Sequence, residues 1–408
     1  MIESTAEKIT NQISGGVTAP AGFAAAGVAC GIKTSDLDLA LVVAAPPAKT
    51  AGIFTTNMVV AAPLIVTKEH LRQSDNTTTA VVVNSGCANA CTGPDGLAAA
   101  RTMAADAARV LNCRPEQVLV SSTGVIGQPL NSEKVREGIA AAAGQLSRSG
   151  HRDAAEAIRT TDRSAKETAV QVTLAGGIIH VGGMAKGAGM IEPHMATMLG
   201  FLTTDADIAP TLLQRALVDA AADTFNAITV DGETSTNDMV LLLASGESGV
   251  HVGEDDYCGF VGAVRAVCRE LALAIVKGGE GATKLVGVTV TGARSKADAR
   301  QGARAIANSP LVKTAIHGGD PNWGRLIAVA GRAGVDFNLA DASVRIGDVV
   351  LFTKETVFSD REPAAAAHLK GTEVAISVDL GVGGSEQATI WTCDFSAEYV
   401  RINADYRT

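Results

Sequence analysis

The chain has 408 residues, a formal net charge of −9 and 47% hydrophobic residues. This length allows two domains or two halves of one large domain, and the apolar content excludes a disordered protein. No cluster of lysine or arginine stands out, so we expect no nucleic-acid partner. No apolar run is long enough for a membrane span, residues 1–16 lack a signal-peptide core, and the seven cysteines have no framework spacing. These features predict a cytoplasmic protein that binds no membrane.

The first part of the chain contains short apolar runs bounded by glycine, proline and aspartate, which are typical of strands. We expect strands at 22–29, 38–43, 51–56, 80–84 and 117–122. Apolar residues at helical spacing predict helices at 97–111 and 132–145, the second with Asn131 or Ser132 as its N-cap. This part of the chain is therefore expected to form a sheet covered by helices.

The rest of the chain continues the mixture without strict alternation. Two runs around Gly176-Gly177 predict a hairpin, and Pro210 opens a predicted helix in its favoured first turn. The predicted strands are 168–174, 178–181, 198–204, 285–291, 344–352, 374–380 and 388–393, and the predicted helices are 209–225, 255–277 and 296–307. An irregular order of strands and helices favours an α+β fold over a doubly wound sheet.

The segment AKGAGMIEPHMATMLG, at 185–200, places Thr197 where a loop enters a predicted strand. A threonine hydroxyl is a poor nucleophile unless a base lies beside it, and an N-terminal threonine carries that base as its own amine. Such a threonine would require cleavage between Ala196 and Thr197, in a loop that Gly187 and Gly189 allow to turn. The alternative is an ordinary threonine at the start of a strand.

Two further positions suggest a site. In SSTGVIG, at 121–127, a strand ends in Thr123-Gly124 and offers a hydroxyl and an N–H that could stabilise an oxyanion, although a plain strand-ending turn is the alternative. Lys186 could bind a carboxylate or lower the pKa of a nearby amine, unless it is a solvated loop lysine. Cys87 and Cys91 are four residues apart without further ligands, so we expect no metal site. These patterns suggest an enzyme but do not name its reaction.

Long motifs in one order along nearly the whole chain carry a resemblance to a known family. They are SSTGVIG at 121–127, RTTD at 159–162, AKGAGMIEPHMATML at 185–199, DGETSTND at 231–238, GGEGATKL at 278–285, NSPLVKTAIHGGDPNWGR at 308–325 and INADYRT at 402–408. Together they closely resemble the ornithine acetyltransferase family, the bifunctional glutamate N-acetyltransferases of the cyclic arginine pathway.

The resemblance implies an αββα sandwich of the DmpA/ornithine-acetyltransferase type, similar to N-terminal-nucleophile hydrolases but with different connectivity. It also implies that the precursor cleaves itself between Ala196 and Thr197. The products would be an alpha chain, 1–196, and a beta chain, 197–408, which form two intertwined halves. These chains are expected to stay together as an α2β2 heterotetramer.

The resemblance also assigns site residues. Thr197 is expected to be the nucleophile in self-cleavage and in acetyl transfer, and Thr123 and Gly124 match the oxyanion pair. The positions that match substrate contacts are Thr160, Lys186, Thr197, Glu280, Asn403 and Thr408.

The implied reaction moves the acetyl group of N2-acetyl-L-ornithine to L-glutamate, giving L-ornithine and N-acetyl-L-glutamate. It is expected to be ping-pong, through an acetyl ester of Thr197, and to need no cofactor. Whether acetyl-CoA is a second acetyl donor stays open. A self-cleaving aminopeptidase or amidohydrolase and a catalytically silent assembly protein are the alternatives.

Overall fold

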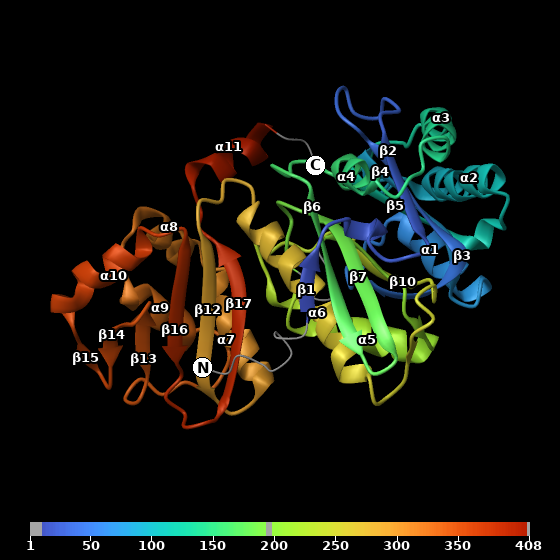
Figure 1. Cartoon of the computed structure of the whole chain (residues 1–408). Coiled ribbons are helices and arrows are strands. Elements are labelled where there is room, and N and C mark those ends of the chain that lie inside the picture. Colours follow the sequence, from blue (N-terminus) through green and yellow to red (C-terminus); the bar gives the residue numbers. More distant parts are fainter. Residues whose placement is uncertain (1–9, 193–197, 406–408) are drawn as a thin grey trace.

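The chain folds into a larger and a smaller lobe that lie side by side (Figure 1). The structure is a computed structural model and describes residues 10–192 and 198–405. The larger lobe extends over residues 10–277 and the smaller one over residues 285–393. Helix α11 (Ala397–Asp405) follows the smaller lobe and lies above the junction of the two lobes in Figure 1.

Within the described residues, nine strands of the larger lobe form one sheet, in which β2 pairs with β3 and the other strands follow the order β1-β6-β7-β8-β10-β3-β4-β5. Their bounds are β1 Thr10–Ile13, β2 Phe23–Val28, β3 Leu39–Phe54, β4 Thr77–Cys87, β5 Val118–Val125, β6 Lys166–Leu174, β7 Gly177–Lys186, β8 Leu199–Thr204 and β10 Met239–Ala244. The pairs β8–β10 and β4–β5 are parallel, and the other pairs are antiparallel. Strands β9 (Asp207–Ile208) and β11 (His251–Val252) pair separately.

Strand β3 takes part in both halves of this sheet. Its residues 39–43 pair with β4 and its residues 49–54 pair with β10, with a register shift between them. Successive side chains of a strand point to opposite faces. Val42 and Phe201 accordingly meet in a core between the two halves, whereas Leu41 and Leu202 belong to two different outer cores. The sheet is therefore folded into two layers that face each other.

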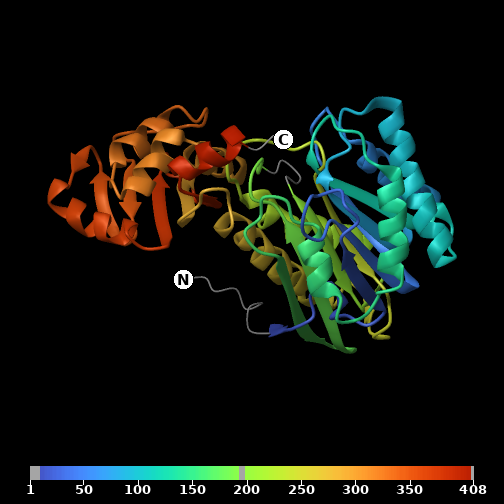
Figure 2. The same ribbon diagram turned by 90° about the horizontal axis from the view of Figure 1, so that it is seen from above.

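Helices cover both outer faces of this double layer. The helices on the β2–β5 half are α1 (Ala62–Gln73), α2 (Gly93–Leu111) and α3 (Ser132–Ala143). The helices on the other half are α5 (Pro210–Ala222) and α6 (Tyr257–Lys277), and α4 (His151–Ala157) packs into the middle core. In Figure 2 the cyan helices lie on one side of the strands and the yellow-brown α6 on the other. The predicted αββα sandwich is confirmed.

The smaller lobe is a second sheet with its own core. Within residues 285–393, six strands follow the order β15-β14-β13-β16-β12-β17. The strands are β12 Leu285–Ala293, β13 Ser343–Ile346, β14 Val349–Thr353, β15 Thr356–Val357, β16 Glu373–Asp379 and β17 Glu386–Cys393, and the helices are α7 Lys296–Ala307, α8 Pro310–Gly318, α9 Trp323–Gly331 and α10 Glu362–Leu369. Alternate residues of β12, such as Val286 and Val288, pack against these helices.

Two local predictions are corrected by the structure, and a helix was missed. The runs at 38–43 and 51–56 belong to the single strand β3, which continues through Pro46 and Pro47, where the register of its pairing with β4 shifts between Val43 and Ala48. The run at 344–352 is two strands, since Gly347 turns the chain with φ of 57°. Helix α11 was not predicted, and within the described residues it has no buried side chain to create an apolar period.

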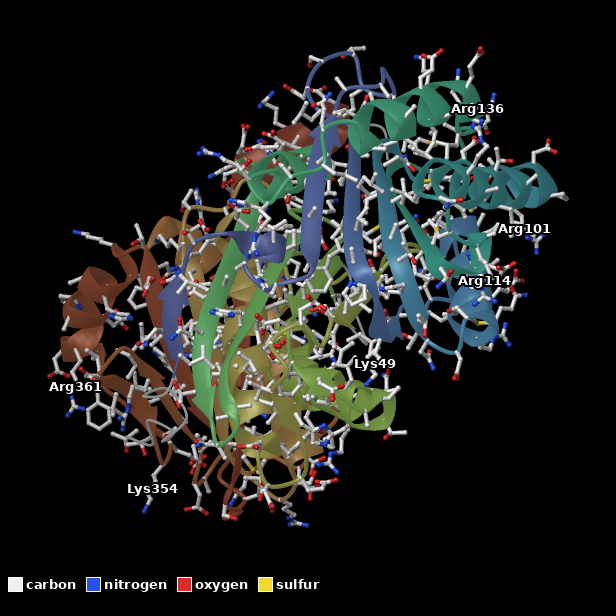
Figure 3. The ribbon with its side chains drawn as sticks, turned by 45° about the vertical axis from the view of Figure 1, so that its right-hand side comes forward. Lys49, Arg101, Arg114, Arg136, Lys354 and Arg361 are labelled. Carbon is white, nitrogen blue, oxygen red and sulfur yellow. The ribbon has the colours of Figure 1, made fainter. Side chains whose placement is uncertain are left out.

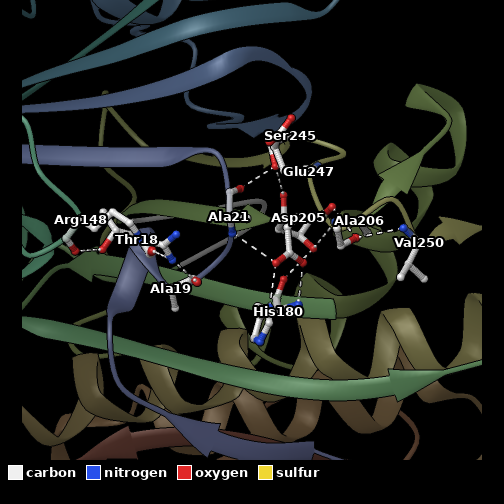
Figure 4. A network of polar contacts seen from close by, with 12 residues as sticks. Thr18, Ala19, Ala21, Arg148, His180, Asp205, Ala206, Ser245, Glu247 and Val250 are labelled. Carbon is white, nitrogen blue, oxygen red and sulfur yellow. Dashed lines mark hydrogen bonds and ion pairs between the residues drawn. The ribbon is translucent and has the colours of Figure 1, made fainter. Parts of the chain in front are cut away.

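A polar network ties the strands together at one edge of the sheet (Figure 4). The buried Asp205 follows β8, and its Oδ1 accepts a hydrogen bond from the backbone N of His180 at 2.7 Å. Its Oδ2 accepts one from the backbone N of Ala21 at 3.2 Å and lies 2.8 Å from Nδ1 of the His180 ring. Ser245, which follows β10, donates to Ala21 O over 2.7 Å. Because β8 and β10 are parallel, this network lies at the C-terminal ends of both strands, and their N-terminal ends lie together at the other end of the sheet.

Basic side chains are distributed over separate elements of both lobes (Figure 3). The labelled ones are Lys49, Arg101, Arg114, Arg136, Lys354 and Arg361. Lys49 pairs with Asp207 at 2.9 Å and Arg101 with Glu69 at 3.1 Å. Within the described residues, no helix combines the length and the apolar composition needed to cross a membrane.

Candidate active site

A pocket lies at one end of the central strands of the sheet, where β7 ends and β8 and β10 begin. Its volume of about 150 Å³ is on the order of ten water positions, enough for a small molecule. The lining residues are Ala88, Thr123, Gly124, Ile126, Thr160, Thr161, Lys186, Gly187, Gly189, Met190, Ile191, Met198, Leu199, Asp231, Glu233, Ser235, Thr236, Asn237, Asp238, Glu280, Tyr399 and Asn403.

The pocket brings together the described residues that were predicted for the site. These are Thr123, Gly124, Thr160, Lys186, Glu280 and Asn403, which come from β5, the 159–162 turn, β7, the segment after α6, and α11. Ala196, Thr197 and Thr408 lie outside the described residues, but Met198, the neighbour of Thr197, lines the pocket. The roles assigned to all these residues stay predictions.

The end of β5 can take only glycine at position 124. Gly124 has φ of 129°, in the region that side chains disfavour, and a Cβ there would lie 2.3 Å from the Gly86 carbonyl carbon. This close approach of β4 and β5 lets Thr123 and Gly124 turn toward the pocket. The local reason for the glycine is therefore packing between strands.

Lys186, at the end of β7, links two of the predicted residues. Its Nζ donates hydrogen bonds to Thr123 Oγ1 (3.1 Å) and to Thr160 Oγ1 (2.9 Å). An ammonium group only donates, so the Thr123 hydroxyl accepts this bond and keeps its own proton for another acceptor. Among the described residues, two of the three Lys186 donors are used in this way, and the third is available to a ligand. Burial lowers the pKa of Lys186, against the opposing effect of the Asp162 charge.

Asp162, the last residue of the RTTD motif, supports the site, although no role was predicted for it. Its carboxylate accepts hydrogen bonds from Gly187 N (2.7 Å), Lys166 Nζ (2.5 Å) and Thr160 N (3.2 Å). Burial alone would raise the pKa of Asp162, but the charges of Lys186 and Lys166 outweigh burial and hold it below its usual value. The ionised Asp162 therefore fixes the turn that presents Thr160.

Glu280 and α11 form another wall of the pocket, and two glycines lie in close contact with it. The nearly buried Glu280 accepts a hydrogen bond from Asn403 Nδ2 at 2.8 Å through Oε2. A Cβ on Gly189 would lie 2.4 Å from that same oxygen, and a Cβ on Gly281 would lie 2.5 Å from Tyr399 N. Gly281, with φ of 69° and backbone against it, therefore needs glycine, whereas a side chain at position 189 would displace the Glu280 carboxylate.

Asp231 and Tyr399 complete this wall, and neither was predicted. Asp231 accepts hydrogen bonds from the backbone N of Met190 (2.7 Å) and Ile191 (2.9 Å) and from the Tyr399 hydroxyl (3.2 Å). Burial and the Asp231 charge raise the pKa of Tyr399. Tyr399 and Asn403 are four residues apart on α11, which puts them on one helix face. DGETSTND was the available signal for Asp231, and none marked Tyr399.

Metal ligands are not gathered at this pocket. Cys87 is buried with its Sγ 3.3 Å from Gln128 O, and Cys91 is exposed. Over residues 10–192 and 198–405, no group of three or more His, Cys, Asp or Glu side chains could hold a metal ion. The pocket offers hydroxyl, ammonium and carboxylate groups for recognising a charged organic molecule.

Fold and pocket together define an αββα-sandwich protein with a small charged pocket where its central strands begin. The model of the ArgJ family matches residues 24–408. The chain belongs to the ArgJ family, and its resemblance to the ornithine acetyltransferases is confirmed.

Relatives that carry the family's name match this chain over nearly the whole length of both proteins. The chain is 47% identical over 402 residues to the arginine biosynthesis bifunctional protein ArgJ of Symbiobacterium thermophilum, covering 97% of this chain and 99% of that protein. Its identity to the protein of the same name from Dehalococcoides mccartyi is 47% over 400 residues, covering 97% and 98%.

Solved structures of the family match part of the chain. An ornithine acetyltransferase of Mycobacterium tuberculosis complexed with ornithine is 43% identical, covers 46% of this chain and 100% of its own, and has a TM-score of 0.43. The ArgJ protein of Bacillus halodurans is 41% identical, covers 46% of this chain and 98% of its own, and has a TM-score of 0.44.

Proposed function

We propose that this chain transfers the acetyl group of N2-acetyl-L-ornithine to L-glutamate in arginine biosynthesis, giving L-ornithine and N-acetyl-L-glutamate. The observation that carries the proposal is the convergence of Thr123, Gly124, Lys186 and Glu280 on one pocket beside Met198. Family membership over residues 24–408 supports the same activity.

The proposed chemistry is ping-pong. Thr197 Oγ attacks the acetyl carbonyl, its α-amine takes the hydroxyl proton, and the proton passes to the departing amine of ornithine. Thr123 and Gly124 stabilise the oxyanion, for which the Thr123 hydroxyl is available because it accepts, rather than donates, its bond with Lys186. The amine of glutamate then takes the acetyl group from the Thr197 ester and restores the free hydroxyl.

Substrate recognition follows from the charges of the pocket. Glu280 binds a substrate ammonium group, and the free Lys186 donor binds a carboxylate. Thr160 and Asn403 lie beside these groups, bonded to Lys186 and Glu280 respectively. Thr197 and Thr408 complete the proposed contacts.

Self-cleavage between Ala196 and Thr197 makes the nucleophile. It divides the chain into 1–196 and 197–408, and the pairing of β8 with β7 supports the proposal that both parts stay together. We place the enzyme in the cytoplasm as an α2β2 assembly without a resident cofactor. An assay with acetyl-CoA and glutamate decides whether acetyl-CoA is a second donor.

The transferase and hydrolase reactions are distinguished by their dependence on glutamate. We expect the purified protein to release ornithine from N-acetylornithine many-fold faster when glutamate is present, with one N-acetylglutamate formed per ornithine. Equal release without glutamate would show an amidohydrolase instead.

The proposed cleavage is tested by denaturing electrophoresis. The wild type should run as two chains, and Thr197→Ala as one chain near the full 41.5 kDa, because it lacks the attacking hydroxyl. A wild type that stays whole would contradict the mechanism.

A further inference from the structure

Asn237 lies in the 231–238 motif, immediately before Asp238 and β10. It is 5% exposed and lines the pocket, yet the proposed chemistry gives it no part. Its side chain crosses from the 231–238 loop to the ends of β4 and β5. The hydrogen bonds it makes there hold the backbone before and after Thr123 and Gly124.

The first bond holds the residue before the oxyanion pair. Asn237 Nδ2 donates to Ser122 O at 2.9 Å, which fixes the plane of the peptide that leads into Thr123. The Ser122 hydroxyl in turn donates to Asn84 Oδ1 at 2.6 Å, and Asn84 Nδ2 donates to Cys87 O at 2.9 Å. Asn84 and Ser122 are fully buried, so these bonds do not compete with water.

The second bond holds the residue after the pair through one intermediate. Asn237 Nδ2 donates to Ala88 O at 2.7 Å, and Ala88 N donates to Val125 O at 3.0 Å. The two hydrogens of one amide group therefore act on both flanks of Thr123-Gly124. Both are used, so the group is a satisfied cross-link between three segments.

The backbone between these two flanks needs such support. Gly124 has φ of 129° and lies against Gly86, in a place where the β4–β5 register is irregular. Glycine adopts this backbone without strain but is equally free to leave it, so bonds from neighbouring segments are needed to hold one geometry. The Asn237 amide supplies bonds on either side of this irregular stretch, at Ser122 O and at Ala88 O.

We infer that Asn237 is a positioning residue that holds Thr123 and Gly124 in the geometry needed to stabilise the oxyanion. The inference rests on the proposed acetyl transfer. It also means that residues 197–408 align the oxyanion pair carried by residues 1–196.

Asn237→Asp is the sharpest test, because it keeps the size of the side chain and places an acceptor-only group against two carbonyls. Displacing the oxyanion pair reduces stabilisation of the transition state more than it reduces binding of the substrate. The value of kcat should therefore fall by about 10²-fold, while KM changes by less than about threefold. Rates are normalised to cleaved chain that can be acetylated on Thr197. Asn237→Ser, which keeps one donor and buries no charge, should show a smaller fall of the same kind.

Asn89→Asp is the matched control. Asn89 is also fully buried and donates through Nδ2 to a carbonyl, Gly96 O at 2.9 Å, but that bond reaches the start of α2 and not the oxyanion pair. It should lower the unfolding temperature and leave kcat near the wild-type value. A folded Asn237→Asp or Asn237→Ser protein with wild-type kcat, or an equal fall of kcat in Asn89→Asp, would overturn the inference. Absence of transfer in the wild type would instead overturn the proposed function.

Discussion

Asp238 is a buried acid that lines the pocket and has one carboxylate oxygen, Oδ2, without a hydrogen-bond partner among the described residues. Its exposed fraction is 2%. The parallel register places it next to Met198, because Met239 N donates to Met198 O at 3.0 Å. Burial raises the pKa of Asp238 well above its usual value, against the lowering effects of Ser235, Lys186 and Thr55.

This raised pKa makes stability depend on pH. Below about pH 3.9 both states of the protein hold the Asp238 proton, and above it the unfolded state loses the proton first, so stability falls toward the native pKa by up to about 1.4 kcal/mol per unit. Asp238→Asn removes this dependence. We expect its urea midpoint to rise relative to wild type as the pH increases above about 3.9.

Asp162→Asn is the control of opposite sign. The pKa of Asp162 is lowered, so its contribution is present above its unfolded pKa and is lost as the pH falls through its native pKa. Removing it leaves the buried Lys166 without its 2.5 Å partner and should destabilise the protein by about 3–5 kcal/mol at neutral pH. If both variants shift the midpoint in the same direction above about pH 3.9, the raised pKa of Asp238 is wrong.

Helix α11 contributes two side chains to the pocket, although none of its described side chains packs into a hydrophobic core. Within its described residues no side chain is buried, and its contacts with the pocket run through Tyr399 and Asn403. Tyr399 also packs on Phe395, with ring centroids 4.4 Å apart. The position of α11 therefore depends on a few polar bonds and one ring contact.

Asn403→Ala should weaken substrate binding. It removes a hydrogen bond to the Glu280 carboxylate, an interaction of about 1.5–3 kcal/mol, and a loss of even the smaller value raises KM for N-acetylornithine by on the order of tenfold. Steady-state kinetics measure this change, and kcat should change less than KM. Arg401→Ala is the control on the same helix, because Arg401 pairs at the surface with Glu398. An equal KM increase in both variants would exclude a specific role of Asn403.

At the scale of the whole molecule, the predicted cleavage position falls in the sequence between β7 and β8, which are neighbouring strands of one sheet. Strand β8 pairs with β7 on one side and with β10 on the other, and its side chains enter two cores. Phe201 reaches the middle core, to which Val42 and Val83 contribute from the other layer. Neither 1–196 nor 197–408 holds a complete sandwich.

Residues 197–408 produced alone should therefore aggregate or fail to fold, because β8 and β10 lose the apolar surface supplied by residues 1–196. Production of both parts in one cell should restore a soluble complex, measured by co-purification through a tag on one part. A folded, soluble 197–408 protein would show that the larger lobe does not need both parts.

Local patterns predicted a large share of the elements. The β6–β7 hairpin, the Asn131 cap of α3 and the long α6 ending at Gly278 all follow from periodicity and end signals within about twenty residues of each other. Helix α11 escaped because an exposed helix has little apolar period. The union of two predicted strands in β3 depends on its partners β4 and β10, which no local window contains.

The sequence by itself determined the α+β class, the family and the positions expected to carry chemistry, because apolar periods, turn residues and long motifs are properties of neighbouring residues. Only the tertiary structure decided that Thr123, Thr160, Lys186, Glu280 and Asn403 share one pocket. It also decided that Asp162 holds a turn, that Asp238 is buried and that Asn237 bridges to Ser122 and Ala88. These are contacts between residues far apart in the chain, and their distances and burial are set only when the sheet folds into two layers.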